Sequence, residues 1–418
     1  MLSKFFLLLA LLASKVVMAN REVFAHYMVG LTYGQSAGQW QQDISDAQSA
    51  GIDGFALNIG SSDSYNDAQL PLAFEAAASR GFSLFLSFDM AASSWTVDQV
   101  VNYINTYKSY GSQFKVNGVP VVSTFEGPNW ADNWASVRSS TGGIFLMPSW
   151  TSLGPSGVGA KLSLIDGAFN WGAWPEANQN TMSTANDIAY KSVLQGKSYM
   201  MGVSPYFYTD LPQYGKNWYS SSDSLWYDRW SQVLDVLPEY VEIITWNDYG
   251  ESSYINAPNA RQIVSGAEGY VNGYDHTAFR FVLPYFIAAY KSGKANVVVP
   301  TEGAMAWYRT TPAKICSNGG TVWGQGGSAS AASGTQDVIS VIALSNSGAS
   351  ITVAIGGESQ PVNVSNTIGK ASFYEIPFTG KTGAVTITMN GKSTTGPKFT
   401  NSCPSSGHVN FNAVSIQV

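Results

Sequence analysis

Two carboxylates stand close together in one short stretch of this sequence. Asp248 and Glu251 lie three positions apart in Ile-Thr-Trp-Asn-Asp-Tyr-Gly-Glu-Ser, residues 244–252, which continues an apolar run that begins at Tyr240. Charged residues make up only 12% of the chain, about half of the usual share of roughly 25%. Paired carboxyl groups can divide a reaction between them, one donating a proton while the other accepts one. We therefore take Asp248 and Glu251 as candidate catalytic groups.

The elements that must position this pair alternate between short apolar runs and longer amphipathic ones. Eight apolar runs are strand candidates: Val23–Val29, Gly54–Ile59, Ser83–Asp89, Pro120–Glu126, Ile144–Trp150, Gly167–Trp174, Tyr199–Phe207 and Tyr240–Trp246. The amphipathic runs are helix candidates at 38–50, 67–80, 96–110, 129–138, 181–195, 224–237 and 276–291. Near-continuous apolar strands that alternate with helices indicate a parallel sheet covered by helices. Eight such units predict a (β/α)8 barrel of the TIM type, an α/β fold, in residues 20–295. The alternative is an open doubly wound sheet, although no G-x-G-x-x-G turn follows the first strand.

Further acids and aromatic residues follow the carboxyl ends of these strand candidates. Because the active site of such a barrel lies at that end of the strands, we expect one rim to gather side chains that bind a substrate. The candidates are Asp89, Glu126, Trp171, Trp174, Tyr206, Trp246 and Asn247. Asp89 and Glu126 could instead bond loop backbones, and Trp171 and Trp174 could instead belong to the core.

Glycoside hydrolysis is the chemistry that needs such a rim. One carboxylic acid protonates the leaving oxygen, and a second carboxylate attacks the anomeric carbon or activates a water. The 13 Trp and 22 Tyr residues provide flat rings that suit the apolar faces of sugars. The sequence has no G-x-S-x-G elbow, H-E-x-x-H motif or phosphate loop.

The charge pattern and the histidine count exclude other classes of partner. The net charge is −6 without a basic run, which argues against a nucleic-acid partner because binding to phosphates needs a positive surface. The three His residues are scattered, so we expect no metal and no cofactor.

The start of the chain predicts export. Residues 1–19 read MLSKFFLLLALLASKVVMA, in which Lys4 precedes an apolar run and small residues precede the expected cleavage site. This is the pattern of a secretory signal peptide. Lys15 makes the apolar run too short for a membrane helix, so we expect a secreted protein without a membrane anchor.

The pattern of apolar and polar residues in the sequence changes after about residue 296. Short alternating runs separated by Gly, Ser and Asn turns predict an all-β sandwich domain in 296–418. Cys316 and Cys403, the two cysteines of the chain, lie near its ends, and in a secreted protein we expect them to form a disulfide rather than two buried thiols. Asn363 begins the one Asn-x-Ser/Thr acceptor for glycosylation.

Seven stretches of the sequence resemble a known family. They are VFAHYMVG (23–30), DISDAQSAGIDGFALNIG (43–60), FLSFDM (85–90), FEGPNW (125–130), FNWGAWP (169–175), SPYFYTD (204–210) and WNDYGESSYI (246–255). Together they resemble glycoside hydrolase family 71, the fungal α-1,3-glucanases or mutanases. The resemblance implies a barrel with an appended β-sandwich, no metal, and hydrolysis of internal α-1,3-glucosidic bonds in cell-wall α-1,3-glucan. It also implies a role in wall remodelling such as cell separation.

The same resemblance implies inversion and points to Asp248 and Glu251 as the catalytic carboxylates. We expect Glu251 to be the general acid and Asp248 the general base, although the roles could be exchanged. Inversion needs carboxyl groups about 6.5–9.5 Å apart, so that a water fits between them, and Gly250 could allow a loop that spreads them. Two alternatives stay open: a wall-glucan-binding protein without activity, and a glycosidase for another α-linked glycan. We expect a monomer.

Overall fold

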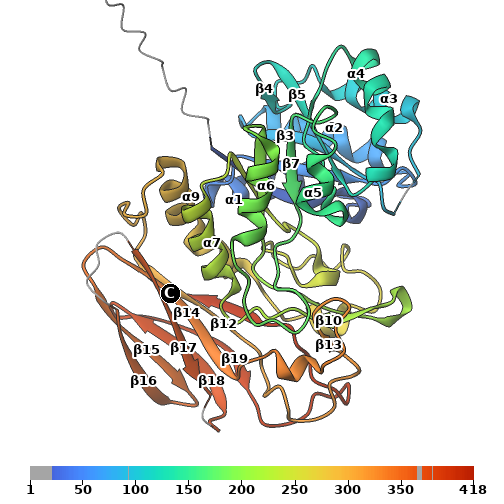
Figure 1. Ribbon diagram of the computed structural model, residues 1–418. Coiled ribbons are helices and arrows are strands. Elements are labelled where there is room, and N and C mark those ends of the chain that lie inside the picture. Colours follow the sequence, from blue (N-terminus) through green and yellow to red (C-terminus); the bar gives the residue numbers. More distant parts are fainter. Residues whose placement is uncertain (1–20, 93, 365–369, 379) are drawn as a thin grey trace, which may run out of the picture.

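The computed structural model describes residues 21–418, except for 93, 365–369 and 379, and gives only the backbone at 361–364 and 370. The predicted signal peptide, residues 1–19, lies outside the described residues. The described chain is a mixed α/β fold built on a curled parallel sheet and followed by a β-rich region (Figure 1). Within the described residues, no helix combines the length and apolar character needed to cross a membrane.

The large sheet contains a strand that overlaps each of the eight predicted strand regions. The parallel strands are β1 (Glu22–Met28), β2 (Gly54–Ile59), β3 (Ser83–Asp89), β5 (Val119–Phe125), β6 (Phe145–Leu146), β7 (Gly167–Asn170), β8 (Ser198–Val203) and β11 (Tyr240–Ile243). Their order is β6-β5-β3-β2-β1-β11-β8-β7, with the short β4 (Lys115–Val116) antiparallel to the start of β5. The ends β6 and β7 approach each other, because the backbone N–H of Asp166 donates to the C=O of Leu146 at 2.8 Å and that of Phe169 to Pro148 at 3.0 Å.

Side chains on the two faces of this sheet enter different cores. One face packs against helices through residues such as Val23, Phe55 and Leu84. On the other face, Phe24, Phe85, Phe169 and other residues from strands all along the sheet form a single buried cluster. Strands from both ends of a sheet can share one cluster only if the sheet curls strongly, and the edge-to-face contact of Phe24 with Phe85, 5.0 Å between ring centroids, is part of this interior.

Helices follow most of the strands and cover the outer face of the sheet. They are α1 (Ala37–Ser49), α2 (Asn66–Ala78), α3 (Val97–Tyr107), α4 (Trp134–Thr141), α5 (Gly154–Gly159), α6 (Ala185–Leu194), α7 (Leu225–Val236), α8 (Glu268–Val271) and α9 (Leu283–Ser292). Capping boxes start two of them, Ser36 with Gln39 at α1 and Thr96 with Gln99 at α3. These polar residues fix where each helix begins, because they satisfy backbone N–H groups that have no partner within the helix.

The β-rich region contains two four-stranded antiparallel sheets. The first has the order β17 (Lys370–Pro377), β14 (Val338–Ser345), β12 (Gly303–Tyr308), β20 (Val414–Gln417). The second has the order β16 (Glu358–Val364), β15 (Ala349–Ile355), β18 (Gly383–Met389), β19 (Lys392–Phe399). The two sheets share one buried cluster, to which the first contributes Ala306 and Val341 and the second contributes Val353.

The two central strands of the first sheet are buried on both faces. Every residue of β12 and β14 is buried, and Met305 and Trp307 of β12 belong to the core of the α/β part. Trp307 also donates its indole N–H to the backbone C=O of Ser222 at 3.1 Å. The two parts of the chain are therefore packed together through a continuous apolar interface.

A third, small sheet links the two parts. It contains β9 (Tyr208–Leu211), β10 (Lys216–Tyr219) and β13 (Val322–Trp323), in the order β13-β10-β9. The predicted disulfide between Cys316 and Cys403 is confirmed, with the Cα atoms 5.7 Å apart. Asn363, the predicted glycosylation acceptor, lies in β16, and the third residue of its motif, at position 365, falls outside the described residues.

Candidate active site

The two candidate acids lie in the tight turn that follows β11. Asp248 caps a single 3₁₀ turn, Tyr249–Glu251, and its Oδ1 accepts a hydrogen bond from the backbone N–H of Glu251 at 3.2 Å. The backbone N–H of Asp248 donates to Thr245 Oγ1 at 2.8 Å. Gly250 is not among the residues with positive φ, so the acids lie at the two ends of one compact turn, and Gly250 does not open it through a left-handed conformation.

Contacts with β1 hold this turn in place. The backbone N–H of Trp246 donates to the C=O of His26 at 2.8 Å. The side chain of Asn247 accepts from the N–H of Met28 at 2.8 Å and donates to its C=O at 3.2 Å. The Tyr270 hydroxyl donates to the C=O of Gly250 at 2.7 Å. The acids are therefore fixed to the end of a neighbouring strand rather than carried on a free loop.

Lys216 forms an ion pair with one of the two acids. Its Nζ lies 2.7 Å from Oε1 of Glu251, and the Lys216 and Glu251 side chains are 43% and 16% exposed. Nearby negative charges, chiefly Glu251 and to a smaller degree Asp248 and Asp89, raise the pKa of Lys216 against the opposing effect of burial. The influence of Asp89 shows that the end of β3 shares this electrostatic neighbourhood.

The environment of Asp248 favours its protonated form. Burial, followed by the negative charge of Glu251, raises its pKa to about 7, although Lys216 and the backbone N–H groups of Glu251 and Gly250 oppose this shift. The cause is general: desolvation and a like charge both disfavour a second carboxylate. At mildly acidic pH, Asp248 therefore holds its proton next to the ion pair that Glu251 forms with Lys216.

The two other predicted acids bond loops next to the strand ends. Oδ1 of Asp89 accepts from the backbone N–H groups of Ala91 and Ala92 at 2.9 and 2.8 Å. Glu126 accepts from the backbone N–H of Ser152 at 3.0 Å and from its hydroxyl at 2.5 Å. Both acids are half-buried. Glu126 therefore braces the loop after β6 with both of its oxygens, while Asp89 uses one oxygen for its own loop.

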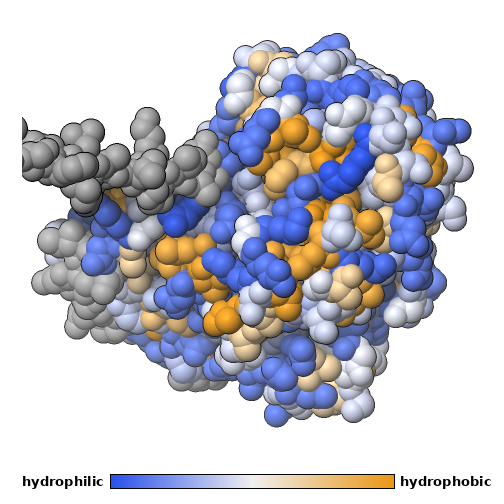
Figure 2. Space-filling model, turned by 45° about the horizontal axis from the view of Figure 1, so that its top comes forward, coloured by the Kyte–Doolittle hydropathy of each residue, from blue (hydrophilic) through white to orange (hydrophobic). Residues whose placement is uncertain are grey.

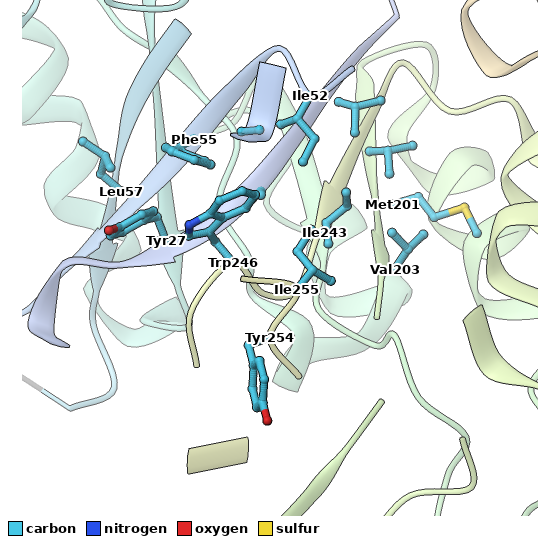
Figure 3. Packing of buried hydrophobic residues seen from close by; sticks show 14 of the residues in the cluster. Tyr27, Ile52, Phe55, Leu57, Met201, Val203, Ile243, Trp246, Tyr254 and Ile255 are labelled. Carbon is cyan, nitrogen blue, oxygen red and sulfur yellow. The ribbon is translucent and has the colours of Figure 1, made fainter. Parts of the chain in front are cut away.

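The predicted aromatic residues divide into two half-buried rings and two buried ones. Trp171 and Trp174 are half-buried and pack on the inner cluster of the sheet, and the Trp174 indole N–H donates to the C=O of Tyr206 at 3.1 Å. Tyr206 is 1% exposed, and its hydroxyl donates to the C=O of Phe411 at 2.7 Å. Trp246 is fully buried, beside Phe55 and Tyr27 (Figure 3).

The buried residues Trp246 and Tyr206 therefore lie in the core behind the site. Neither the Trp246 ring nor the Tyr206 ring is open to a sugar in this structure, and Asn247 is also fully buried. Trp171 and Trp174 remain the predicted rings with exposed surface.

Sequence reasoning missed Lys216 and a buried ion pair. Lys216 lies in the β9–β10 hairpin. In this part of the sequence, we predicted a strand that ends at Phe207 and a helix at 224–237, but no element between them. His26 Nδ1 lies 2.6 Å from Glu242 Oε1, and both side chains are 1% exposed. Burial raises the pKa of Glu242, and His26 opposes that shift. The alternation of Phe24 with His26, and of Tyr240 with Glu242, is the sequence signal that places both on the inner face of the sheet.

Two exposed tyrosines were also missed. Among the described residues, the large hydrophobic side chains that stay strongly exposed are Tyr33, Ile188, Tyr214 and Val298. Tyr33 follows β1, is 77% exposed and contacts the Tyr65 ring edge-on, with 5.8 Å between centroids. Tyr214 lies in the turn of the β9–β10 hairpin. Since β1 and β8 flank β11 in the sheet, the loops on both sides of the acid turn each present an exposed ring. Figure 2 shows that one face of the molecule carries apolar side chains in separate patches among hydrophilic ones.

No group of three or more His, Cys, Asp or Glu side chains within the described part of the chain is placed to hold a metal ion.

Comparison with known proteins places this chain in a family. The family model of glycosyl hydrolase family 71 matches residues 19–418. The chain belongs to glycosyl hydrolase family 71. A glucan endo-1,3-alpha-glucosidase of Schizosaccharomyces pombe is 36% identical over 435 residues, an alignment that covers 98% of each chain. A mutanase of Penicillium rubens is 36% identical and covers 82% of this chain and 77% of its own.

A third relative and a solved structure also match this chain. An ascus wall endo-1,3-alpha-glucanase of S. pombe is 33% identical, covering 81% of this chain and 82% of its own. A family 99 endo-alpha-mannosidase from Bacteroides thetaiotaomicron superposes with a TM-score of 0.53 at 12% identity, covering 65% of this chain and 98% of that one. At that identity, the likeness concerns the fold alone.

Proposed function

We propose that this family 71 member hydrolyses internal α-1,3-glucosidic bonds of cell-wall α-1,3-glucan, with Asp248 and Glu251 as its catalytic pair. The observation that carries the proposal is the acid turn at the carboxyl end of β11. There, Asp248 and Glu251 bracket one 3₁₀ turn, and Lys216 lies 2.7 Å from Glu251. The names of the three relatives supply the substrate.

We assign the acid role to Asp248 and the base role to Glu251, which exchanges the roles expected from the sequence. The general acid must hold a proton at working pH, and burial together with the charge of Glu251 raises the pKa of Asp248 to about 7. The general base must be ionised, and Glu251 is the member of the pair that lies in an ion pair, with Lys216 Nζ 2.7 Å from its Oε1.

The reaction then follows from these two states. Asp248 donates its proton to the glycosidic oxygen as the bond between that oxygen and the anomeric carbon breaks. Glu251 removes a proton from a water that attacks the anomeric carbon from the opposite face. An α-linked substrate then releases a β-configured reducing end, after which Asp248 takes up a proton from solvent and Glu251 releases one. Inversion is the course that the family resemblance implies.

The rim residues then bind the glucan chain, either directly or by positioning others. The half-buried Trp171 and Trp174 and the free oxygen of Asp89 are the proposed contacts with sugars, and Tyr33 and Tyr214 extend the binding surface on either side. Glu126 acts by holding the Ser152 loop. Trp246, Asn247 and Tyr206 act from the core, where they hold the acid turn and Trp174.

We further propose a closed (β/α)8 barrel in residues 20–295 with a β-sandwich domain in 296–418. The hydrogen bonds from Asp166 and Phe169 to the β6 segment support closure between β6 and β7, as does the shared inner cluster. The two facing sheets and their common core support the sandwich. We also propose that the protein is a secreted monomer that acts at the cell wall, with residues 1–19 as its signal peptide and Asn363 as a glycosylation site.

Release of reducing ends by the purified protein tests the proposed activity. We would offer α-1,3-glucan, α-1,4-glucan and β-1,3-glucan at equal mass, and size the products early in the reaction. We expect activity on α-1,3-glucan alone, with a mixture of oligosaccharides from internal cleavage. Activity on another glucan would refute the substrate. Binding to α-1,3-glucan without any release would refute catalysis and leave a wall-binding protein.

A further inference from the structure

Lys216 reaches Glu251 from a hairpin that the C-terminal region holds in place. We propose that two segments of that region, 316–324 and 403–411, joined by the Cys316–Cys403 disulfide, position Lys216 against Glu251 and so set the pH range in which the acid pair works. We call them the disulfide-linked segments. This role rests on the proposed function of Asp248 and Glu251. It makes the C-terminal region a part of the active site rather than an appended module.

The first of these segments pairs with the outer edge of the hairpin. β9 and β10 pair with each other, and β10 also pairs in parallel with β13, Trp218 opposite Val322. The backbone N–H of Gly324 donates to the C=O of Tyr219 at 2.7 Å. The side-chain amide of Asn217, next to Lys216, donates to the C=O of Gly319 at 3.0 Å. The strand that carries Lys216 is therefore fixed on both edges.

The second segment contacts the other strand of the hairpin. His408 Nε2 lies 3.0 Å from Asp210 Oδ2. Phe411 packs against the rings of Tyr208 and Tyr219, with 5.8 Å between centroids in each case. Its backbone C=O also accepts the Tyr206 hydroxyl just before β9. Both strands of the hairpin are thus held by residues that come much later in the chain.

The disulfide lies where these two segments meet. The backbone N–H of Val409 donates to the C=O of Ser317 at 2.8 Å. Gly319, with φ of +65°, lies so close to His408 that an added Cβ would be 2.8 Å from the imidazole ring. The Cys316–Cys403 bond closes this contact directly beside the residues that touch Asn217 and Asp210. Losing the bond would free both segments at once.

The hairpin needs this support because it is small. β9 and β10 have four residues each, and an isolated two-stranded hairpin is at best marginally stable in water. At its inner side, Leu211 approaches Gly250 within the acid turn. A shift of the hairpin would therefore move Lys216 away from Glu251 without unfolding the large sheet.

The charges around the site determine how a movement of Lys216 would change the pH dependence of the reaction. The acids that act on Lys216 are Glu251, Asp248 and Asp89, while Tyr270 faces Asp248 and His408 faces Asp210. The Lys216 ammonium lowers the pKa of Asp248, so moving it away lets the proposed acid keep its proton to higher pH, and the alkaline limb of the pH–rate profile moves up. Removing the disulfide should thus have the same effect as removing the charge of Lys216.

The test compares pH profiles of kcat/KM on α-1,3-glucan. Cys316→Ser/Cys403→Ser should move the alkaline limb upward by as much as Lys216→Met, about one pH unit for the loss of a neighbouring opposite charge. Adding Lys216→Met to the double variant should move it no further, because both changes remove the same contact. The matched control is Lys381→Met, which breaks an ion pair with Glu358 in the second sheet and should leave the limb unchanged.

A milder variant covers the case in which the double cysteine variant does not fold. Asn217→Ala removes one hydrogen bond to the first segment and should move the limb upward by about half a unit, a part of the full effect of the lost charge. An alkaline limb that stays in place in folded Asn217→Ala and double cysteine variants, while Lys216→Met moves it, would overturn the proposal. Full activity in Asp248→Asn or Glu251→Gln would instead refute the proposed function itself.

Discussion

Replacing Lys216 with Met should shift the pH dependence of catalysis in a defined direction. The Lys216 ammonium lies 2.7 Å from Glu251 Oε1. Coulomb's law at that distance gives about 1.5 kcal/mol even in the dielectric of water. We take this lower bound because the Lys216 side chain is 43% exposed, and solvent weakens ion pairs at the surface. An energy of about 1.4 kcal/mol corresponds to one pH unit.

The direction of the shift depends on which protonation state the charge of Lys216 favours. Lys216 lowers the pKa of Asp248, so without Lys216 the proposed acid keeps its proton to higher pH, and the alkaline limb moves up by about one unit. At a fixed pH on the alkaline limb, activity relative to the maximum should therefore rise about tenfold, the factor that one pH unit represents.

The assay is initial-rate release of reducing ends from α-1,3-glucan across the pH range. Lys115→Met is a matched control, because it removes the same charge from the exposed strand β4, which pairs with the start of β5 rather than with the carboxyl ends of the strands. A uniform loss of activity at every pH, with both limbs in place, would refute the role of Lys216 in the charge state of the pair.

Two further predictions concern stability and substrate length. Arg229→Met should lower the free energy of unfolding, measured in urea, by about 3–5 kcal/mol. The substitution leaves the buried Asp187 carboxylate without the guanidinium that donates to both of its oxygens. A loss below about 1 kcal/mol would contradict this prediction. Tyr33→Ala should raise KM for the polymer about fivefold, as the loss of about 1 kcal/mol of apolar contact predicts, and leave a trisaccharide unaffected. Ile188→Ala, which removes an exposed side chain on α6, is its control, and an equal effect of both substitutions would contradict a binding role for Tyr33.

The strands of the large sheet could be predicted from sequence because their signal is local. Gly54–Ile59 and Ser83–Asp89 are continuous apolar runs, and both strands have these bounds in the structure. The fifth and sixth strands are shorter than predicted, since β6 covers only Phe145–Leu146 and β7 ends at Asn170. Beyond β6 the chain still hydrogen-bonds to β5, where the N–H groups of Met147 and Ser149 donate to the C=O groups of Val122 and Thr124, but the regular strand pairing has ended. How far regular pairing extends depends on how the neighbouring strands curve, which composition does not record.

The candidate site could be predicted only in part, for the same reason. Asp248 and Glu251 stand out because two acids are unusual in an apolar stretch. Trp246 and Trp171 give the same local signal, yet one is fully buried and the other half-buried, because their surroundings come from distant strands. Lys216 had no local signal, since its contact with Glu251 depends on a hairpin held by residues near the end of the chain.

Substitution of the two acids tests the central claim most directly. Asp248→Asn and Glu251→Gln preserve the size of each side chain and remove its ability to exchange a proton. We predict that each lowers kcat on α-1,3-glucan by at least about 100-fold, the range for losing a general acid or base, in protein that stays folded by circular dichroism. Asp248→Asn should regain activity on an α-1,3-oligosaccharide with a good aryl leaving group, which needs no proton from an acid. Near-normal hydrolysis of α-1,3-glucan by either variant would contradict the account.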